Sequence, residues 1–268
     1  MYNDILTIGP LTIHGYGLMI AIGILTALLI GEARAKRKGL NPDEMYNLTF
    51  CCGIGGFLGA KLMFCMVEWR SFLENPWVLL KSDGFVVYGG IILGVVSGYL
   101  WCRFRKLVFL DYFDMVMPSV AVAQGFGRIG CFLAGCCYGR ETESWCGVIF
   151  THSDYAPNGV RLIPTQLISS AGIFAIAGIL MWYARKPRKQ GQVGFLYMML
   201  YSIGRTCVEF LRNDHRGAIG VFSTAQFISI FIFIIGVIGF WKMSMRKAVF
   251  AGGQETVSAA RAESEGAE

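Results

Sequence analysis

The stretch YGLMIAIGILTALLIGEARAKRK, from Tyr16 to Lys38, decides the fold class of this chain. It begins with a long apolar run and ends in a cluster of basic residues that starts at Arg34. A helix of about 20 apolar residues crosses the ~30 Å hydrocarbon core of a bilayer. An apolar run followed by basic residues is typical of a transmembrane helix that ends on the cytoplasmic side.

Further apolar runs of the same kind recur along the chain. The predicted spans are residues 16–33, 46–67, 85–102, 111–133, 165–183, 194–211 and 221–241. Of the 268 residues, 54% are hydrophobic and only 16% are charged, whereas a soluble domain carries roughly 25% charged residues. We therefore predict an all-α polytopic membrane protein with about seven transmembrane helices, and the composition argues against a soluble fold.

The basic residues indicate how these spans are oriented. Clusters follow the first, third, fifth and seventh spans, and the other connections hold few basic residues. The clusters are Arg34, Lys36, Arg37 and Lys38; Arg103, Arg105 and Lys106; Arg185, Lys186, Arg188 and Lys189; and Lys242, Arg246 and Lys247. Because positive loops stay in the cytoplasm, we expect the amino terminus outside and the carboxyl terminus inside. The net charge of +6 therefore indicates topology rather than binding of nucleic acid.

The predicted domain organisation is simple. Residues 1–247 form one membrane domain, in which residues 134–163 are the longest outer connection and polar enough to form a small cap. Residues 248–268 are small and acidic and have too little apolar surface to fold, so we expect a disordered cytoplasmic tail.

Three basic residues, Lys61, Arg128 and Arg205, fall inside predicted spans. A charge at the bilayer centre costs at least ~2.5–3.5 kcal/mol, so each needs a partner, water or an anionic ligand. On a helix, Arg205, Glu209 and Arg212 share one face. Glu209 can pair with only one of the two arginines, and the positive charge left over favours an anion site. A salt-bridge network that only fixes helix packing is the alternative.

Arg128 is surrounded by small residues near the outer end of its span. Gly127 and Gly130 flank it, and Gln124 lies one turn before it. The guanidinium group binds phosphate in a bidentate manner and stays charged. We therefore expect Arg128 and Arg205 to bind the phosphate of a phospholipid, with a snorkelling arginine as the alternative for Arg128.

Four cysteines cluster on the outer side of the chain: Cys131, Cys136, Cys137 and Cys146. Disulfides that brace the cap are expected on this side, which is open to oxidation. Packing thiols, a zinc site and a reactive thiol beside Arg128 stay open as alternatives. No metal-binding motif and no serine triad is visible, so neither a metal nor a cofactor is predicted.

Several motifs together resemble those of the bacterial prolipoprotein diacylglyceryl transferase family, over nearly the whole chain. The strongest is GRIGCFLAGCCYG, from Gly127 to Gly139. The others are HGYGLMIAIG (residues 14–23), GGFLGAKLMF (55–64), VVYGGIILG (86–94), IPTQL (163–167) and GRTCVEFLR (204–212). The family has the seven-helix topology expected above.

The resemblance implies an enzyme of the bacterial cytoplasmic (inner) membrane. Its members transfer the diacylglyceryl group of phosphatidylglycerol to the lipobox cysteine thiol of preprolipoproteins, which forms a thioether and releases glycerol phosphate. The implied partners are phosphatidylglycerol, the lipobox region of the preprolipoprotein and membrane lipids, without nucleic acid. A same-fold paralogue with another lipid donor or thiol acceptor is one alternative. An anion or lipid transporter is another, although no paired internal repeats are visible.

The resemblance also implies roles for particular residues. Arg128 and Arg205 are the expected catalytic pair. The implied substrate-binding residues are Tyr16, Lys61, Tyr88, Gly89, Gly90, Gln124, Glu209 and Arg212. The chain departs from the family pattern at several polar positions: cysteines stand at 131 and 136 where the family usually has asparagine and glutamate, and Tyr88 stands where its best-studied members have histidine.

Overall fold

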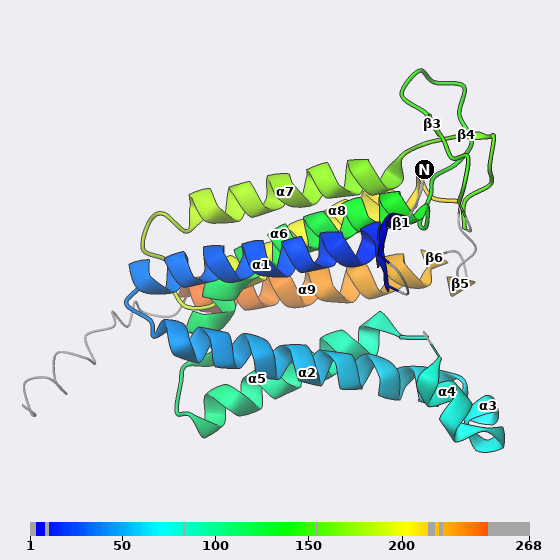
Figure 1. The fold of residues 1–268 in the computed structure, drawn as a ribbon. Helices are drawn as coiled ribbons and strands as arrows, with labels where there is room; N and C mark the ends of the chain where they lie inside the picture. Colours follow the sequence, from blue (N-terminus) through cyan, green and yellow to red (C-terminus); the bar gives the residue numbers. More distant parts are fainter. Residues whose placement is uncertain are drawn as a thin grey trace, which may run out of the picture.

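The computed structural model describes residues 4–8, 11–82, 84–153, 155–213, 218–219 and 222–245. Its long helices lie side by side, as Figure 1 shows. They are α1 (Gly15–Arg37), α2 (Pro42–Val67), α5 (Val87–Phe104), α6 (Phe109–Ala134), α7 (Thr165–Tyr183), α8 (Gln192–Glu209) and α9 (Thr224–Met245). Each predicted span coincides with one of these helices. The predicted tail, residues 248–268, lies outside the described residues.

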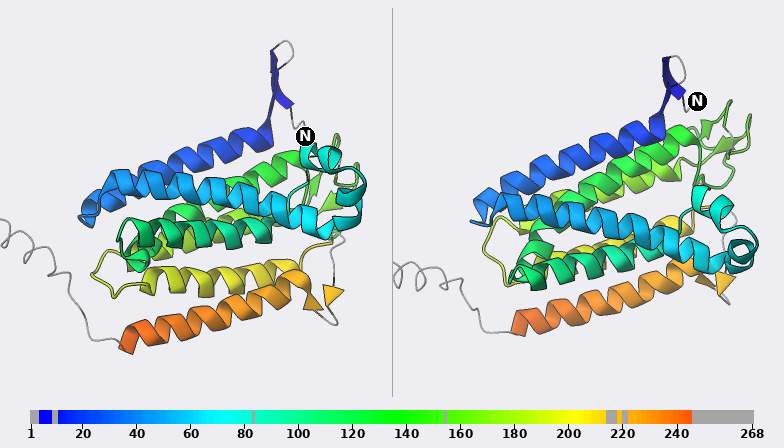
Figure 2. Two further views of the ribbon diagram at one scale, coloured as in Figure 1. Left: turned by 90° about the horizontal axis from the view of Figure 1, so that it is seen from below. Right: turned by 60° about the horizontal axis from the view of Figure 1, so that its bottom comes forward.

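Six of the long helices are long and apolar enough to cross a membrane, which confirms the predicted class of all-α polytopic membrane protein. The helix that falls short is α8, an 18-residue helix that carries Gln192, Arg205 and Glu209. It nevertheless lies within the bundle, where it packs against α7 and α9 (Figures 1 and 2). The exact number of seven crossings stays a prediction.

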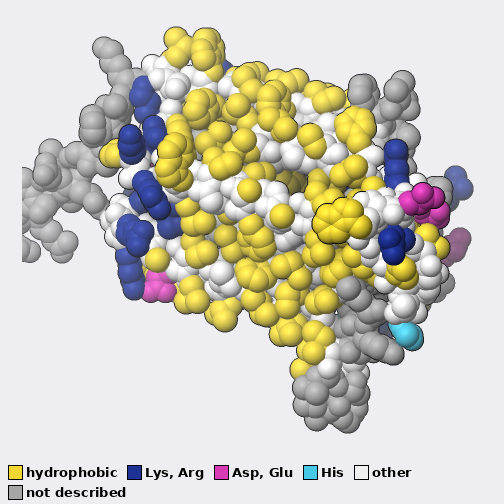
Figure 3. Space-filling view, turned by 90° about the horizontal axis from the view of Figure 1, so that it is seen from above, with side chains coloured by type: hydrophobic (Ala, Val, Ile, Leu, Met, Phe, Trp, Pro, Cys, Tyr) yellow, Lys and Arg dark blue, Asp and Glu magenta, His cyan; other side chains and the backbone are white. Residues whose placement is uncertain are grey.

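The surface of the bundle fits a lipid environment. In Figure 3, hydrophobic side chains cover a broad band, and most of the visible Lys and Arg side chains gather at one end of it. Large apolar residues such as Leu29, Phe57 and Ile91 are more than half exposed, which an aqueous surface would not favour over such an area. We call the end that holds Arg34, at the end of α1, the basic end and the opposite end, where α6 ends, the cap end.

Short elements occupy the cap end. The helices α3 (Trp69–Glu74) and α4 (Pro76–Lys81) join α2 to α5, and a hairpin of β1 (Asp4–Ile8) and β2 (Leu11–His14) precedes α1. Two smaller hairpins pair β3 (Val148–Ile149) with β4 (Arg161–Leu162) and β5 (Ala218–Ile219) with β6 (Phe222–Ser223). The segment between α6 and α7 has its own apolar cluster, in which Phe132 of α6 packs with Phe150, Ala156 and Leu162.

Close contacts between backbones hold α2 against α5. A Cβ atom on Gly59 would lie 2.3 Å from the carbonyl oxygen of Gly89, and a Cβ atom on Gly89 would lie 2.3 Å from that of Gly59. Any larger residue at either position would push the helices apart. Small residues that let backbones approach are a common way to associate helices in lipid, so the four-residue spacing of glycines in these spans has a packing role.

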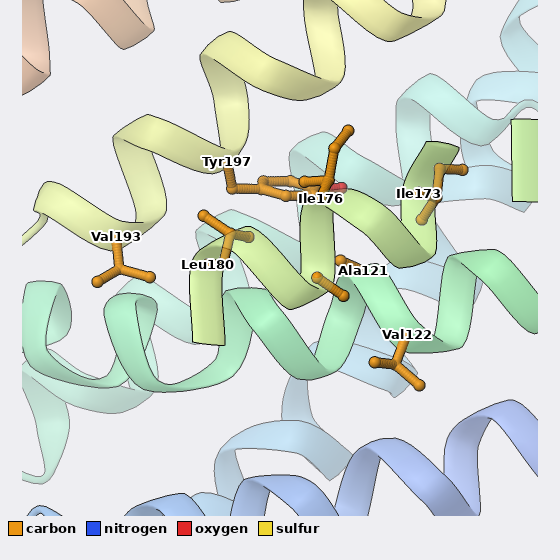
Figure 4. Packing of buried hydrophobic residues seen from close by; sticks show 8 residues of the cluster. Ala121, Val122, Ile173, Ile176, Leu180, Val193 and Tyr197 are labelled. Atoms are coloured by element: carbon orange, nitrogen blue, oxygen red, sulfur yellow. The ribbon is translucent and has the colours of Figure 1, made fainter. Parts of the chain in front are cut away.

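The main core lies between α6, α7 and α8. Figure 4 shows Ala121 of α6 facing α7, which contributes Ile173, Ile176 and Leu180, with Val193 and Tyr197 of α8 beside them, whereas Val122 of α6 points away from α7. At the basic end, the buried carboxylate of Asp114 on α6 accepts hydrogen bonds from the backbone N–H groups of Gly191 (2.7 Å) and Gly194 (2.8 Å) at the start of α8. This core fixes the relative positions of the helices that carry Arg128 and Arg205.

Candidate active site

Arg128 lies near the end of α6, at the cap end. Gly130 allows α1 to pass close by, because a Cβ atom there would lie only 3.1 Å from the Cδ2 atom of Tyr16. This close approach places Tyr16 within electrostatic range of Arg128 and of the neighbouring cysteines. Gly130 therefore lets α1 pack against the part of α6 that holds Arg128.

Arg205 lies on α8 and pairs with Glu209 one turn later. The two side chains form a salt bridge and are only 11% and 10% exposed. Glu209 also forms a hydrogen bond with Ser223, directly before α9. The hydrogen bond of Glu209 with Ser223 therefore links α8 to the residue before α9. The ion pair with Glu209 restricts the guanidinium group of Arg205.

Arg212 follows the end of α8 and is buried, with 8% of its surface exposed. Its backbone forms an antiparallel bridge with Gly139, the last residue of the GRIGCFLAGCCYG segment. This bridge brings the end of α8 back to the segment that holds Arg128. Residues from two distant motifs therefore meet at one place.

Arg128, Arg205 and Arg212 line a single pocket, together with Cys137, Thr165, Gln166, Ser169 and Val208. The pocket between these side chains opens to the outside and measures about 230 Å³ when that open space is counted. Its side chains come from α6, α7, α8 and the turns that follow α6 and α8. Glu209 compensates part of the charge of the three guanidinium groups, and no carboxylate is among the described residues that line the pocket. The surplus positive charge and the bidentate geometry of arginine suit a phosphate group.

The start of α7 completes the wall of this pocket. Thr165 donates a hydrogen bond from Oγ1 to the carbonyl oxygen of Cys137 (2.8 Å), and Gln166 donates one from Nε2 to that of Cys136 (2.8 Å). Gln166 is 1% exposed, yet its Oε1 atom has no hydrogen-bond partner among the described residues. A buried acceptor without a partner costs free energy, and a ligand donor in the pocket would remove that cost.

The turn after α6 gathers three of the four clustered cysteines. The Sγ atoms of Cys131, Cys136 and Cys137 all lie within 4.8 Å of one another. The described cysteines form no disulfide with one another, so the expected disulfides stay a prediction. The neighbouring thiols of Cys131 and Cys137, together with burial, raise the pKa of Cys136. Cys146 lies apart from the three: it is exposed and contacts Ser144.

Other residues that the sequence pointed to lie elsewhere. Gln124 accepts a hydrogen bond from the hydroxyl of Tyr197 (2.7 Å) and does not line the pocket. Lys61 donates to the carbonyl oxygens of Ser82 (2.6 Å) and Gly84 (3.3 Å). Tyr88, Gly89 and Gly90 begin α5, and both glycines pack on α2. A substrate-binding role for these five residues stays a prediction.

Sequence reasoning did not single out Thr165, Gln166, Ser169 and Val208 as parts of the site. The only available signal was their occurrence in or near two of the quoted motifs. A glutamine or threonine at the start of an apolar span is compatible with helix capping, and only the fold shows that these residues face the arginines.

Comparisons with known proteins agree with this geometry. Residues 3–242 match the family model described as prolipoprotein diacylglyceryl transferase. The chain is 49% identical to the phosphatidylglycerol–prolipoprotein diacylglyceryl transferase of Clostridium tetani, over 86% of this chain and 93% of that protein. It is 46% identical to transferase 2 of Clostridium perfringens, over 85% and 90% of the two chains. The corresponding protein of Legionella pneumophila (strain Lens) is 34% identical, over 88% and 94%.

Proposed function

The chain belongs to the prolipoprotein diacylglyceryl transferase family, and from this premise we propose that Arg128 and Arg205 bind the phosphate of the lipid donor during transfer. The protein is a multi-pass transferase of the bacterial inner membrane. It transfers the diacylglyceryl group from phosphatidylglycerol to prolipoprotein.

One observation carries the assignment: three arginines line one pocket, and none of the described residues that line it is a carboxylate. Phosphatidylglycerol has a phosphodiester between its diacylglyceryl group and its glycerol headgroup. In the proposed reaction, the acceptor thiolate attacks the diacylglyceryl carbon that bears the phosphate ester. A carbon–sulfur bond forms, the carbon–oxygen bond breaks, and the electron pair leaves with glycerol phosphate. The thiol proton goes to water.

Charge grows on the phosphate as this bond breaks, because the diester anion becomes a monoester with a second ionisable oxygen. Fixed positive groups that face the place where charge develops stabilise a transition state more than the ground state. Arg205 is fixed in this way by its ion pair with Glu209. Arg128 projects from the last turns of α6 into the same pocket. Arg212 adds a third positive charge and supports the product anion.

Gln166 supplies an uncharged contact to the headgroup of phosphatidylglycerol. Its free Oε1 atom is an acceptor, so it cannot bind the phosphate oxygens, but it can accept a hydrogen bond from a hydroxyl of the glycerol headgroup. Its amide is held in place by the bond from Nε2 to Cys136. We therefore assign Gln166 to recognition of the headgroup.

The assignment is tested by transfer from labelled phosphatidylglycerol to a lipobox peptide, measured as thioether product. Alanine at Arg128 or Arg205 should lower the rate by at least the ~100- to 1,000-fold that loss of one charge-stabilising donor typically costs. Arg140 provides a matched control, because it is an exposed arginine of the same segment outside the pocket. Full activity of either pocket variant would overturn the assignment.

A further inference from the structure

The three thiols beside the arginine pocket have the arrangement of metal ligands. Four-coordinate zinc holds sulfur at about 2.3 Å, so two sulfurs of a tetrahedral site lie about 3.8 Å apart. The Sγ atoms of Cys131, Cys136 and Cys137 already lie within 4.8 Å of one another. Small rotations of the side chains would therefore bring all three to one zinc ion.

The backbone builds this cluster through a defined helix end. Gly135 has a φ of +76°, and its N–H donates to the carbonyl oxygen of Phe132 while the N–H of Cys136 donates to that of Cys131. These two bonds are a Schellman motif, which brings the side chains of its first and last residues together. Here those two residues are Cys131 and Cys136.

Cys137 is held in an unusual conformation. Its φ of +61° lies in the left-handed region, which non-glycine residues adopt at a cost of roughly 1–3 kcal/mol. Hydrogen bonds from Thr165 and Gln166 to the carbonyl oxygens of Cys137 and Cys136 fix the turn in place. Such strain is found most often at functional sites, and here it directs a third thiol to the other two.

A metal accounts for all three thiols better than the alternatives do. A disulfide would join two of them and leave the third. The thiols are only partly buried, so apolar packing does not require them. Cys137 also lines the arginine pocket, which places the cluster at the edge of the proposed phosphate site.

We propose that Cys131, Cys136 and Cys137 bind one Zn²⁺ as thiolates and leave its fourth position open to the thiol of the acceptor protein. Three protein ligands with one open position are the usual arrangement of catalytic zinc. Three thiolates and Zn²⁺ carry a net charge of −1, which the neighbouring Arg128 offsets. This role for the metal rests on the proposed transferase function.

The site would supply the nucleophile of the reaction. A thiol that coordinates zinc is deprotonated, so the acceptor cysteine loses its proton to water on binding. The zinc-bound thiolate then attacks the diacylglyceryl carbon, and glycerol phosphate leaves into the arginine pocket. The metal keeps its oxidation state. The thioether product is neutral and a weaker ligand, so it can dissociate.

Metal content tests the site without reference to activity. The full chain is purified under reducing conditions, and zinc is measured by elemental analysis. We expect one zinc per chain, with serine at Cys131, Cys136 or Cys137 reducing zinc to background. Serine at Cys146 is the matched control and should leave the zinc in place, because Cys146 is an exposed cysteine outside the cluster. Wild type without zinc, or unchanged zinc in all three variants, would overturn the proposal.

A second measurement uses only the wild-type protein, so it tests the proposal even if the serine variants do not fold. Cobalt is exchanged for zinc in the wild-type protein, and its thiolate absorption is followed while a lipobox peptide is added. The spectrum should change with the cysteine peptide and stay the same with a serine peptide. An identical response to both peptides would contradict the open fourth position. An active enzyme without zinc would refute the metal site alone, whereas a zinc protein that forms no thioether would refute the transferase assignment.

Discussion

Arg205 and Glu209 form a nearly buried ion pair across one turn of α8, and Arg205 also lines the pocket that it shares with Arg128 and Arg212. The pair therefore connects the packing of α8 to the chemistry of the pocket. Glu209 restricts the motion of the Arg205 guanidinium group. Because it neutralises only one of the three arginines, the pocket keeps a net positive charge.

Replacing Glu209 with glutamine tests this positioning role. The amide keeps the size of the side chain but removes the charge, so Arg205 loses its fixed orientation. We expect kcat to fall about 10- to 150-fold, because hydrogen bonds to charged groups contribute ~1.5–3 kcal/mol, while the KM for phosphatidylglycerol does not rise. Glu141, an exposed residue of the cap, serves as the control when changed to glutamine. A raised KM with unchanged kcat would contradict the positioning role.

Gln166 is expected to determine preference for the headgroup. Leucine at this position removes the acceptor, so transfer from phosphatidylglycerol should weaken about tenfold, the equivalent of one hydrogen bond of ~1–1.5 kcal/mol. Transfer from phosphatidylpropanol, whose headgroup has no hydroxyl, should fall about tenfold less in the variant than transfer from phosphatidylglycerol does, because with this lipid only the bond from Nε2 to Cys136 is lost. Equal losses with both donors would show that Gln166 acts on the fold rather than on the headgroup.

Alanine at Gly59 should destabilise the protein, because the added Cβ would lie 2.3 Å from the carbonyl oxygen of Gly89. Overpacking of this kind typically costs ~1–3 kcal/mol. Gly53 lies on the same helix with nothing within 4 Å of an added Cβ, so alanine there should leave the thermal unfolding midpoint unchanged or raise it slightly. Equal midpoints for the two variants in detergent would contradict the close packing of α2 and α5.

Asp114 supports the opposite end of the bundle. Alanine at this position leaves the backbone N–H groups of Gly191 and Gly194 buried without their acceptor, which should cost about 1–3 kcal/mol of stability. Asp111, whose side chain accepts only an exposed bond from Gln190, should tolerate alanine better. Because Asp114 lies at the basic end, the specific activity of the folded fraction should stay unchanged.

Much of the fold could be predicted from hydropathy alone. Long apolar runs fix where helices start and end, since lipid leaves the backbone no other way to satisfy its hydrogen bonds. The helices α3 and α4 and the small hairpins were not predicted. Their apolar stretches are too short for hydropathy to distinguish a strand or a short helix from a loop.

The site was only partly predictable. Arg128 and Arg205 were recognisable because charge inside apolar spans is costly, and Arg212 because it shares a helix face with Arg205 and Glu209. The sequence could not show that α7 contributes Thr165 and Gln166, since that depends on how helices pack. It also could not separate Cys146 from the other cysteines. The glycine at 135 was the one available clue, because a glycine that ends a helix brings Cys131 and Cys136 together.

The predicted orientation also remains to be measured. A reporter that is active only in the cytoplasm should be active when fused after Glu268 and silent when inserted at Asn158. The reverse pattern would place the basic end outside and would move the arginine pocket to the inner leaflet.

The most direct test of the central claim is the affinity of the purified protein for glycerol phosphate, because binding stays measurable when transfer does not. Calorimetry compares the wild type with Arg128→Ala, Arg128→Lys, Arg205→Ala and the control Arg140→Ala. Each alanine variant of the pocket should bind about 10- to 100-fold more weakly, as loss of a charged hydrogen bond requires. Lysine at Arg128 should restore little of this loss, because it lacks the bidentate geometry. Wild-type affinity in either pocket alanine variant would contradict a phosphate site shared by Arg128 and Arg205.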